Sequence, residues 1–333
     1  MASNYEDFIH ISRYARYIEE ENRRETYSDT VNRWWSYMTY KFPSLAKHKD
    51  VKQAILDKEV MPSMRTMMAA GDALERNHIA AYNCSYIAVD DPKAFDETLM
   101  ILMCGTGVGY SVERDFVDRM PEVPENIIRT DEVVTVADSK EGWARGLRQL
   151  VMRLYAGEHP TWDLSRIRPS GSRLKTFGGR ASGPEPLDNL FRFVTSTFYK
   201  AQGRKLTSLE CHDMMCAVAA AVVVGGVRRS AMISLSNLSD DRMRHAKMGS
   251  WFNENVNRSY ANNSIAFSTK PDMGTFLREW TAIYESKSGE RGIFNRTAAM
   301  NKAKEIGRDE SFRFGTNPCG EISLRSKQFC NLS

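Results

Sequence analysis

The sequence lacks the features that mark membrane-spanning and nucleic-acid-binding proteins. No segment offers about 18 uninterrupted apolar residues, and the acidic, amphipathic N-terminus has no apolar signal-peptide core. The 46 basic and 42 acidic residues leave a net charge of +4, too even a balance to hold a nucleic acid by bulk electrostatics. We therefore expect a cytoplasmic chain with no membrane and no nucleic-acid partner.

Cysteine is also scarce, and its spacing argues against two common uses. None of the cysteines forms a C-x-x-C pair, and a cytosolic chain of this size is not expected to be built on disulfides. We do not expect Cys211, His212 and Cys216 to place two ligands on one helical face, so no metal site is predicted. Catalytic, redox or buried structural thiols remain, and the candidates are Cys84, Cys104, Cys211, Cys216, Cys319 and Cys330.

What is present predicts a folded α/β protein. The 333 residues are 42% hydrophobic and 26% charged, a balance typical of globular proteins that bury a sizeable core. Apolar spacing indicates helices through residues 5–58, with Ser28 and Asp29 capping the second stretch and Pro43 ending it. We expect residues 1–58 to form an N-terminal helical segment and residues 59–333 a second, larger domain.

Strands and helices alternate through the larger domain. We expect a helix that starts at Pro92 and stops in the glycine cluster 104–109, and a hairpin-like stretch at 127–138. The basic, glycine-rich segment 166–186 should be a loop. Strands are predicted at 82–90, 110–113, 231–236, 262–268 and 292–295, and further helices at 141–157, 187–201, 206–223, 273–286 and 296–307.

One short segment near the end of the sequence brings together residues capable of chemistry. Asn317, Cys319 and Glu321 alternate across Pro318 and Gly320. Proline disfavours helix here, and an extended chain would turn the amide, thiol and carboxylate to one side. Such a trio can orient a hydroxyl, hold a reactive sulfur and accept a proton. A surface turn with a buried thiol is an equally good reading, and spacing alone does not decide between them.

Ordered motifs run from roughly residue 55 to residue 333, too many to arise by chance. They are PSMRTMMAAG, NCSYIAVD, FDETLMILMCGTGVGYSVE, IRPSGSRLKTFGGRASGPEPL, GRKLTSLECHD, VVVGGVRRSAMISLS, SGERGIFNR, FGTNPCGEISLR and QFCNL. Together they resemble the monomeric, adenosylcobalamin-dependent (class II) ribonucleotide reductases that act on nucleoside triphosphates. The resemblance implies the first half of a ten-stranded α/β barrel, with an effector-binding region at about 90–235 and a catalytic finger loop at 315–330.

The resemblance also implies a role for each residue of the finger-loop trio. Cys319 would be the thiyl radical site: the 5′-deoxyadenosyl radical of adenosylcobalamin takes its hydrogen, and the thiyl then abstracts the ribose 3′ hydrogen. Glu321 would accept the 3′-hydroxyl proton, and Asn317 would hold the ribose hydroxyls.

Two further thiols match the family's reducing pair. Cys84 in NCSY and Cys330 in QFCNL would supply two electrons and end as a disulfide that is transient in the cytosol. The alternative is a pair of buried structural cysteines. Cys104, within the glycine cluster, is interpreted as structural, because three glycines without a following Lys-Ser or Lys-Thr are a weak phosphate signal.

Nucleotide contacts are expected at three other places. The loop Gly225, Gly226, Arg228, Arg229 and Ser230 resembles the family's loop between substrate and effector, although a plain hairpin turn fits the same residues. Asp91 lies where the family binds effector ribose. Ser63 resembles a substrate-contacting position, and its alternative is a helix cap.

The basic loop carries a cluster of cations among glycines. They suit triphosphate binding, although a solvated loop is about as good a reading. The residues concerned are Arg166, Arg168, Arg173, Lys175 and Arg180.

The partners implied are a ribonucleoside triphosphate, a deoxynucleotide effector and thioredoxin or a similar dithiol reductant. Because the family's barrel continues beyond the finger loop, a polypeptide carrying its C-terminal half is expected as well. The alternative is an inactive nucleotide-binding remnant, and the intact trio with Cys84 and Cys330 argues against it.

Overall fold

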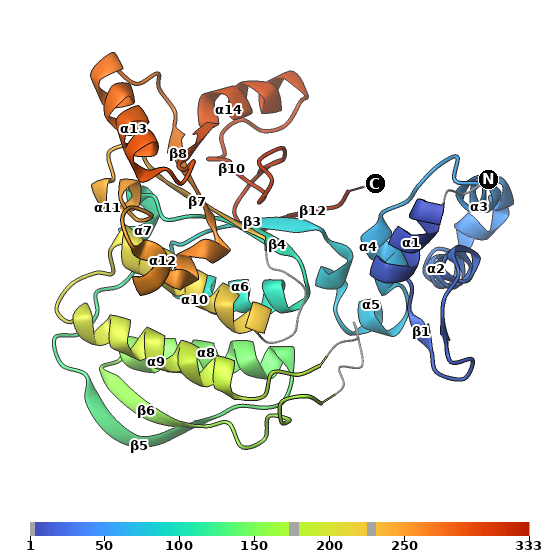
Figure 1. Ribbon diagram of the computed structural model, residues 1–333, viewed down its shortest axis with the longest axis horizontal. Coiled ribbons are helices and arrows are strands. Elements are labelled where there is room, and N and C mark those ends of the chain that lie inside the picture. Colours follow the sequence, from blue (N-terminus) through green and yellow to red (C-terminus); the bar gives the residue numbers. More distant parts are fainter. Residues whose placement is uncertain (1–3, 173–179, 225–230, 333) are drawn as a thin grey trace. The chain divides into compact units, whose positions relative to one another are not determined.

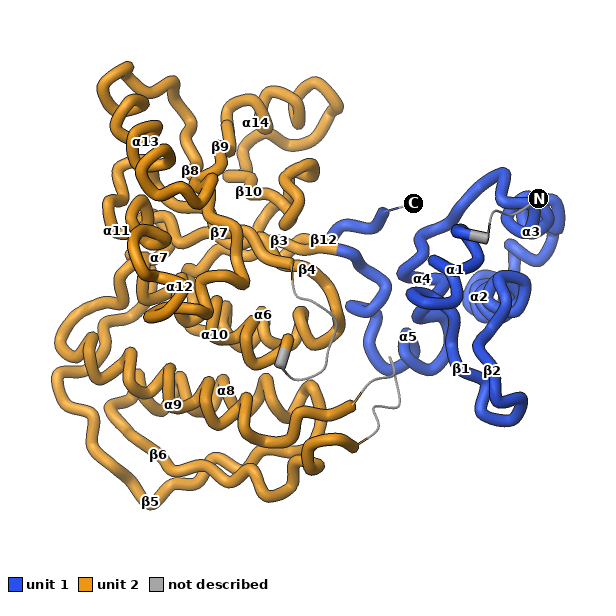
Figure 2. The backbone as a smooth tube through the Cα atoms, in the orientation of Figure 1, with its two compact units in different colours: residues 1–83, 330–333 blue, residues 84–329 orange. Residues whose placement is uncertain are grey.

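A computed structural model describes residues 4–172, 180–224 and 231–332 (Figure 1). The chain divides into two compact units, coloured separately in Figure 2. Unit 1 comprises Met1–Asn83 with Cys330–Ser333, and unit 2 comprises Cys84–Phe329. The predicted domain division at residue 58 stays a prediction.

Unit 1 is largely helical, as expected, but its helices are not continuous. A short antiparallel pair, β1 (Tyr17–Ile18) and β2 (Arg23–Arg24), separates the first two helices. The cap of the second helix is Thr26, whose side chain and Asp29 bond each other's backbone N–H, so Ser28 was the wrong cap. The helices are α1 (Asn4–Arg13), α2 (Tyr27–Lys41), α3 (Lys49–Leu56), α4 (Met64–Ala69) and α5 (Asp72–Arg76), with 3-10 turns η1 (Pro43–Lys47) and η2 (His78–Ala81).

Unit 2 is built on a sheet with the strand order β12-β3-β4-β7-β8-β9. The run from β3 to β9 is parallel throughout, which confirms the α/β class. Closure of such strands into a barrel stays a prediction. The strands are β3 (Cys84–Ala88), β4 (Gly107–Ser111), β7 (Met232–Asn237), β8 (Asn262–Phe267), β9 (Gly292–Asn295) and β12 (Gln328–Cys330).

Helices cover one face of this sheet (Figure 1). Val108 and Tyr110 of β4 are buried in the core with α6 (Lys93–Met103) and α10 (Ser208–Val224). A second layer, α8 (Lys140–Tyr155) and α9 (Glu185–Lys200), packs behind them. The remaining helices are α7 (Arg114–Val117), α11 (Asp241–Arg244), α12 (Trp251–Glu254), α13 (Met273–Ser286) and α14 (Arg296–Glu305), with the 3-10 turn η3 (Val256–Tyr260).

The predicted hairpin at 127–138 is wrong. Residues Ile128–Thr135 form one strand, β5, which pairs in parallel with β6 (Glu158–Asp163), a strand that the sequence analysis missed. The polar pair Asp131 and Glu132 imitates a turn, but it lies at a register shift on an exposed strand. The predicted strand 110–113 in fact begins earlier, inside the glycine cluster at Gly107.

A hairpin, β10 (Gly315–Thr316) with β11 (Ser323–Leu324), occupies the other face of the sheet. Alternation along β4 turns Gly107 and Gly109 toward it, away from the core. A Cβ on Gly109 would lie 1.8 Å from the Thr316 carbonyl oxygen, and one on Gly107 would lie 2.9 Å from Pro318 Cγ. The glycine cluster therefore lets one backbone approach another.

No helix among the described residues is long and apolar enough to cross a membrane.

The close approach predicts a stability defect for Gly109→Ala. The new methyl group would overlap the Thr316 carbonyl, and overpacking of this kind costs about 1–3 kcal/mol in free energy of unfolding, with loss of the docked hairpin. Gly274→Ala is the control, because this exposed helical glycine has only the Asp272 side chain nearby, at 3.2 Å. Urea unfolding measures both variants, and equal stability of Gly109→Ala and the unaltered chain would contradict the packing described.

Candidate active site

The segment from Asn317 to Ile322 is a tight turn, so the predicted extended conformation is wrong. The Gly320 N–H donates to the Asn317 carbonyl at 3.0 Å, and Gly320 has a φ of +88°. Proline after the first turn residue and glycine at the fourth favour this β-turn, which outweighs the preference of the Asn-Pro step for extension. The turn alternative was correct in form, except that its thiol is exposed rather than buried.

Asn317 organises the turn and contacts the first cysteine of the sheet. Its side chain is fully buried, and its Oδ1 accepts the Ile322 N–H at 3.0 Å. Its Nδ2 lies 3.6 Å from Cys84 Sγ, within reach of a weak hydrogen bond to sulfur. Cys84 itself is buried at the start of β3. One amide therefore links the turn to a thiol more than 200 positions away in sequence.

Cys319 stands exposed within the turn. Partial burial, together with the charges of Glu321 and Cys84, raises the pKa of the Cys319 thiol above its ordinary value. The thiol is therefore protonated at neutral pH and keeps its hydrogen. The hairpin thus brings Asn317, Cys319, Glu321 and Cys84 together, with Glu321 exposed beside the thiol.

Two other residues of the predicted site, Cys330 and Ser63, belong to unit 1. Cys330 is buried, and its carbonyl accepts the N–H of Asn83, the residue that precedes Cys84 in the chain, at 3.0 Å. Ser63 is the N-cap residue of α4, yet its side chain makes no capping hydrogen bond. Its hydroxyl is buried without a partner among the described residues. Ser63 therefore occupies the cap position, but the expected capping hydrogen bond from its hydroxyl is absent.

Of the residues predicted to bind the effector, Asp91 lies within the described part of the chain. Asp91 accepts the Lys93 N–H at 2.8 Å just before α6, so it starts a helix in addition to any nucleotide role. Gly225, Gly226, Arg228, Arg229 and Ser230 lie outside the described residues, as do Arg173 and Lys175 of the basic loop. Arg168 is paired with Asp138 at 2.7 Å.

A buried cluster on α10 corrects the expectation that His212 and Cys216 do not share a face. Tyr110 OH lies 2.7 Å from His212 Nδ1, and Cys216 Sγ lies 3.6 Å from His212 Nε2. Burial lowers the pKa of His212 to about 3 and raises the pKa of Cys216 to about 12, so both groups are neutral. No metal-binding group of three was found within the described ranges, and the cluster is a neutral hydrogen-bonded one.

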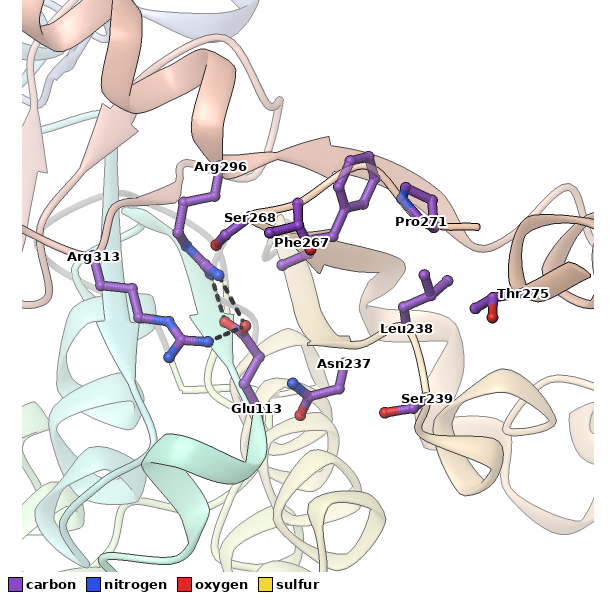
Figure 3. A pocket seen from close by; sticks show the side chains of 12 residues that line it. Glu113, Asn237, Leu238, Ser239, Phe267, Ser268, Pro271, Thr275, Arg296 and Arg313 are labelled. Carbon is purple, nitrogen blue, oxygen red and sulfur yellow. Dashed lines mark hydrogen bonds and ion pairs between the residues drawn. The ribbon is translucent and has the colours of Figure 1, made fainter. Parts of the chain in front are cut away.

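A pocket of about 320 Å³, which no sequence motif predicted, lies at the carboxyl ends of β4, β7 and β8 (Figure 3). Its wall includes a buried carboxylate, Glu113, and two arginines, Arg296 and Arg313. The motifs YSVE and IFNR contain two of these residues, but nothing in their spacing shows that they meet. The other lining residues are Asn237, Leu238, Ser239, Ala266, Phe267, Ser268, Thr269, Pro271 and Thr275.

Comparisons with known proteins agree on one family. A family model for the insertion domain of B12-dependent ribonucleotide reductase matches residues 111–198, the region of β5, β6, α8 and α9. The adenosylcobalamin-dependent ribonucleoside-triphosphate reductase of Lactobacillus helveticus is 27% identical over 96% of this chain and 53% of its own length. The corresponding reductase of Levilactobacillus brevis is 28% identical over 96% and 52%.

A solved structure agrees with the fold. The crystal structure of a B12-dependent (class II) ribonucleotide reductase matches with a TM-score of 0.82 and 24% identity, over 97% of this chain and 54% of that one. The resemblance seen in the motifs is therefore confirmed. The chain spans about half the length of the curated relatives it matches.

The turn predicts a defect for Asn317→Ala. The half-buried Ile322 N–H and the buried Cys84 thiol would lose their partner, and an unsatisfied buried group costs about 1–3 kcal/mol. Asn253→Ala, at an exposed position of unit 2, should change the free energy of unfolding by less than about 0.5 kcal/mol. Chemical denaturation compares the two, and similar small effects would show that the Asn317 amide does not hold the turn.

Proposed function

We propose that this chain, which resembles the B12-dependent ribonucleotide reductases in sequence and fold, carries the thiol side of their catalytic site. The reaction would reduce ribonucleoside triphosphates to 2′-deoxyribonucleoside triphosphates for DNA precursor synthesis. The observation that carries the proposal is the hairpin that sets an exposed, protonated Cys319 beside Asn317, Glu321 and Cys84.

The protonated state of Cys319 suits a donor of hydrogen atoms. A thiolate has no S–H hydrogen to lose, whereas the raised pKa of Cys319 keeps that hydrogen in place. Adenosylcobalamin, when bound, supplies the organic radical that removes it. The exposed thiol fits this partner, and we assign no described residue to hold the corrin ring.

The substrate would then meet the neighbouring groups. The Cys319 thiyl takes the ribose 3′ hydrogen, and the Glu321 carboxylate accepts the proton of the 3′-hydroxyl. Asn317 holds the ribose hydroxyls, in addition to closing the turn. Ser63 is proposed to contact the substrate, which its buried and unpartnered hydroxyl supports.

The reducing equivalents would come from Cys84 and Cys330. As their thiols become a disulfide they release two electrons and two protons, the 2′-hydroxyl leaves as water, and a hydrogen takes its place. The hydrogen bond between Cys330 and Asn83, which is covalently joined to Cys84, supports the pairing. Thioredoxin or a similar dithiol would return both thiols to the reduced state.

We further propose that specificity control resides in residues 90–235, with a deoxynucleotide at Asp91 and the 225–230 loop. The chain spans about half the length of its relatives. We propose that a polypeptide carrying the family's C-terminal half supplies the cobalamin contacts and completes the barrel. Thiol chemistry of this kind requires a reducing compartment, so we place the reaction in the cytoplasm.

Cys319→Ser tests the radical role. The chain would be assayed with the polypeptide that carries the C-terminal half, adenosylcobalamin, a ribonucleoside triphosphate and a dithiol. The variant should lose all reduction, because a serine O–H is too strong to replace the thiol as a hydrogen donor. Cys104→Ala, at a buried cysteine outside the hairpin, should retain activity. Turnover by Cys319→Ser would contradict the proposal. So would an unaltered chain that binds nucleotides but reduces none.

The reducing pair makes a prediction that needs no turnover. Mild oxidation of the folded chain should join Cys84 to Cys330, and peptide mass spectrometry identifies that cross-link. Cys211 and Cys216 are buried too and serve as internal controls that stay reduced. Recovery of Cys84 and Cys330 as free thiols after oxidation would exclude them as a redox pair.

A further inference from the structure

A buried carboxylate lies where β4 ends, next to the base of the hairpin. Glu113 accepts both terminal nitrogens of Arg296, at 2.9 and 2.6 Å, and the Ser111 hydroxyl at 2.8 Å. Glu113 is fully buried, and Arg296 is 1% exposed. The pair is therefore bidentate and shielded from solvent, the geometry in which an ion pair is most directional.

The same guanidinium also holds the hairpin. Arg296 Nε donates to the Phe314 carbonyl at 2.8 Å, and Phe314 immediately precedes β10. Arg296 thus connects the carboxyl end of β4, the first turn of α14 and the entry to the hairpin. A lysine could not reproduce these contacts, because it has a single nitrogen and no planar fork.

A second arginine reaches the same carboxylate from the segment that leads into the hairpin, just before β10. Arg313 donates to Glu113 at 2.7 Å and also pairs with Asp115. Figure 3 shows the two guanidiniums converging on Glu113. The other arm of the hairpin is held separately, by Arg308 Nη1 on the Ser323 carbonyl at 2.9 Å.

Burial opposes the charge of Glu113, but the hydrogen bonds and charge of Arg296, with Ser111 and Arg313, leave its pKa below the ordinary value. The pair therefore stabilises the fold above the pKa of an unfolded carboxyl, and this stabilisation is lost as the pH falls through the lower, folded value. Apolar side chains of similar volume often stabilise a core as well as a buried ion pair does. We therefore interpret this pair as fixing the position of the hairpin rather than as a main source of stability.

We propose that Glu113, Arg296 and Arg313 form a positioning cluster that sets the location of Cys319. Four residues lie between Phe314 and Cys319. Asn317, one of them, closes the turn through two hydrogen bonds with Ile322. A shift at the base therefore carries the thiol with it. The catalytic meaning of the cluster rests on the proposed function, but its control of Cys319 does not.

The test measures Cys319 itself. Iodoacetamide labels the full chain across a pH series, and mass spectrometry follows the Cys319 peptide, since the other described cysteines are buried. In Glu113→Gln and Arg296→Lys the hairpin loosens, Cys319 loses its partial burial and its proximity to Cys84, and its pKa falls. One unit of pKa is a tenfold change in thiolate, so labelling at pH 7.5 should rise about three- to tenfold.

Two variants keep the test decisive. Arg313→Met removes a half-buried partner, should stay folded, and should accelerate labelling in the same direction by a smaller factor. Asp213→Asn breaks a different ion pair of unit 2, Arg258 with Asp213 at 2.7 Å, and should leave Cys319 labelling unchanged.

Labelling rates within twofold of the unaltered chain in all cluster variants would overturn the proposal. Equal acceleration in Asp213→Asn would overturn it as well. A chain that proved not to be a reductase would leave these labelling results intact, so failure of the proposed function is distinguishable from failure of the positioning cluster.

Discussion

The structure around the thiol depends on one contact, the approach of the hairpin backbone to the backbone of β4. At Gly109 there is no room for even a methyl group, because the Thr316 carbonyl fills that space. Gly315 repeats the condition from the hairpin side, where a Cβ would lie 2.1 Å from the Tyr86 ring. With side chains excluded, the hairpin follows the sheet surface, and Asn317 reaches Cys84. Placement of Cys319 is therefore a property of the sheet as much as of the turn.

Two groups near the hairpin differ in charge: the Cys319 thiol is neutral, and the Glu113 carboxylate is ionised. At the turn, partial burial and the charges of Glu321 and Cys84 raise the pKa of Cys319, so its hydrogen is retained. At the base of the hairpin, Glu113 has two guanidinium partners, so its charge is retained although it is buried. A hydrogen-atom donor needs the first condition, and a fixed scaffold is served by the second. The Glu113 cluster adjoins the residue before β10, Phe314, and the turn that carries Cys319 follows the end of β10 at Thr316.

Local sequence predicted the elements well where periodicity was strong. The helices that became α6, α8, α9 and α10 were expected, as were most strands of the large sheet. Prediction failed where tertiary contacts decide. The Asn317–Glu321 segment turns because Gly320 accepts a positive φ, whereas alternation suggested extension. Glu113 and Arg296 are 183 positions apart, and only the fold brings them together. The 225–230 loop stays a prediction.

The central claim is that Cys319 donates its hydrogen atom to a cofactor-derived radical. Its most direct test is isotope exchange. The chain and the polypeptide that carries the C-terminal half are incubated with adenosylcobalamin deuterated at the 5′ carbon. Mass spectrometry then follows the loss of deuterium from the cofactor to water. Because a thiol S–H exchanges with solvent, the account predicts loss of deuterium with the unaltered chain and none with Cys319→Ser. Loss of the label at the same rate in both would contradict it.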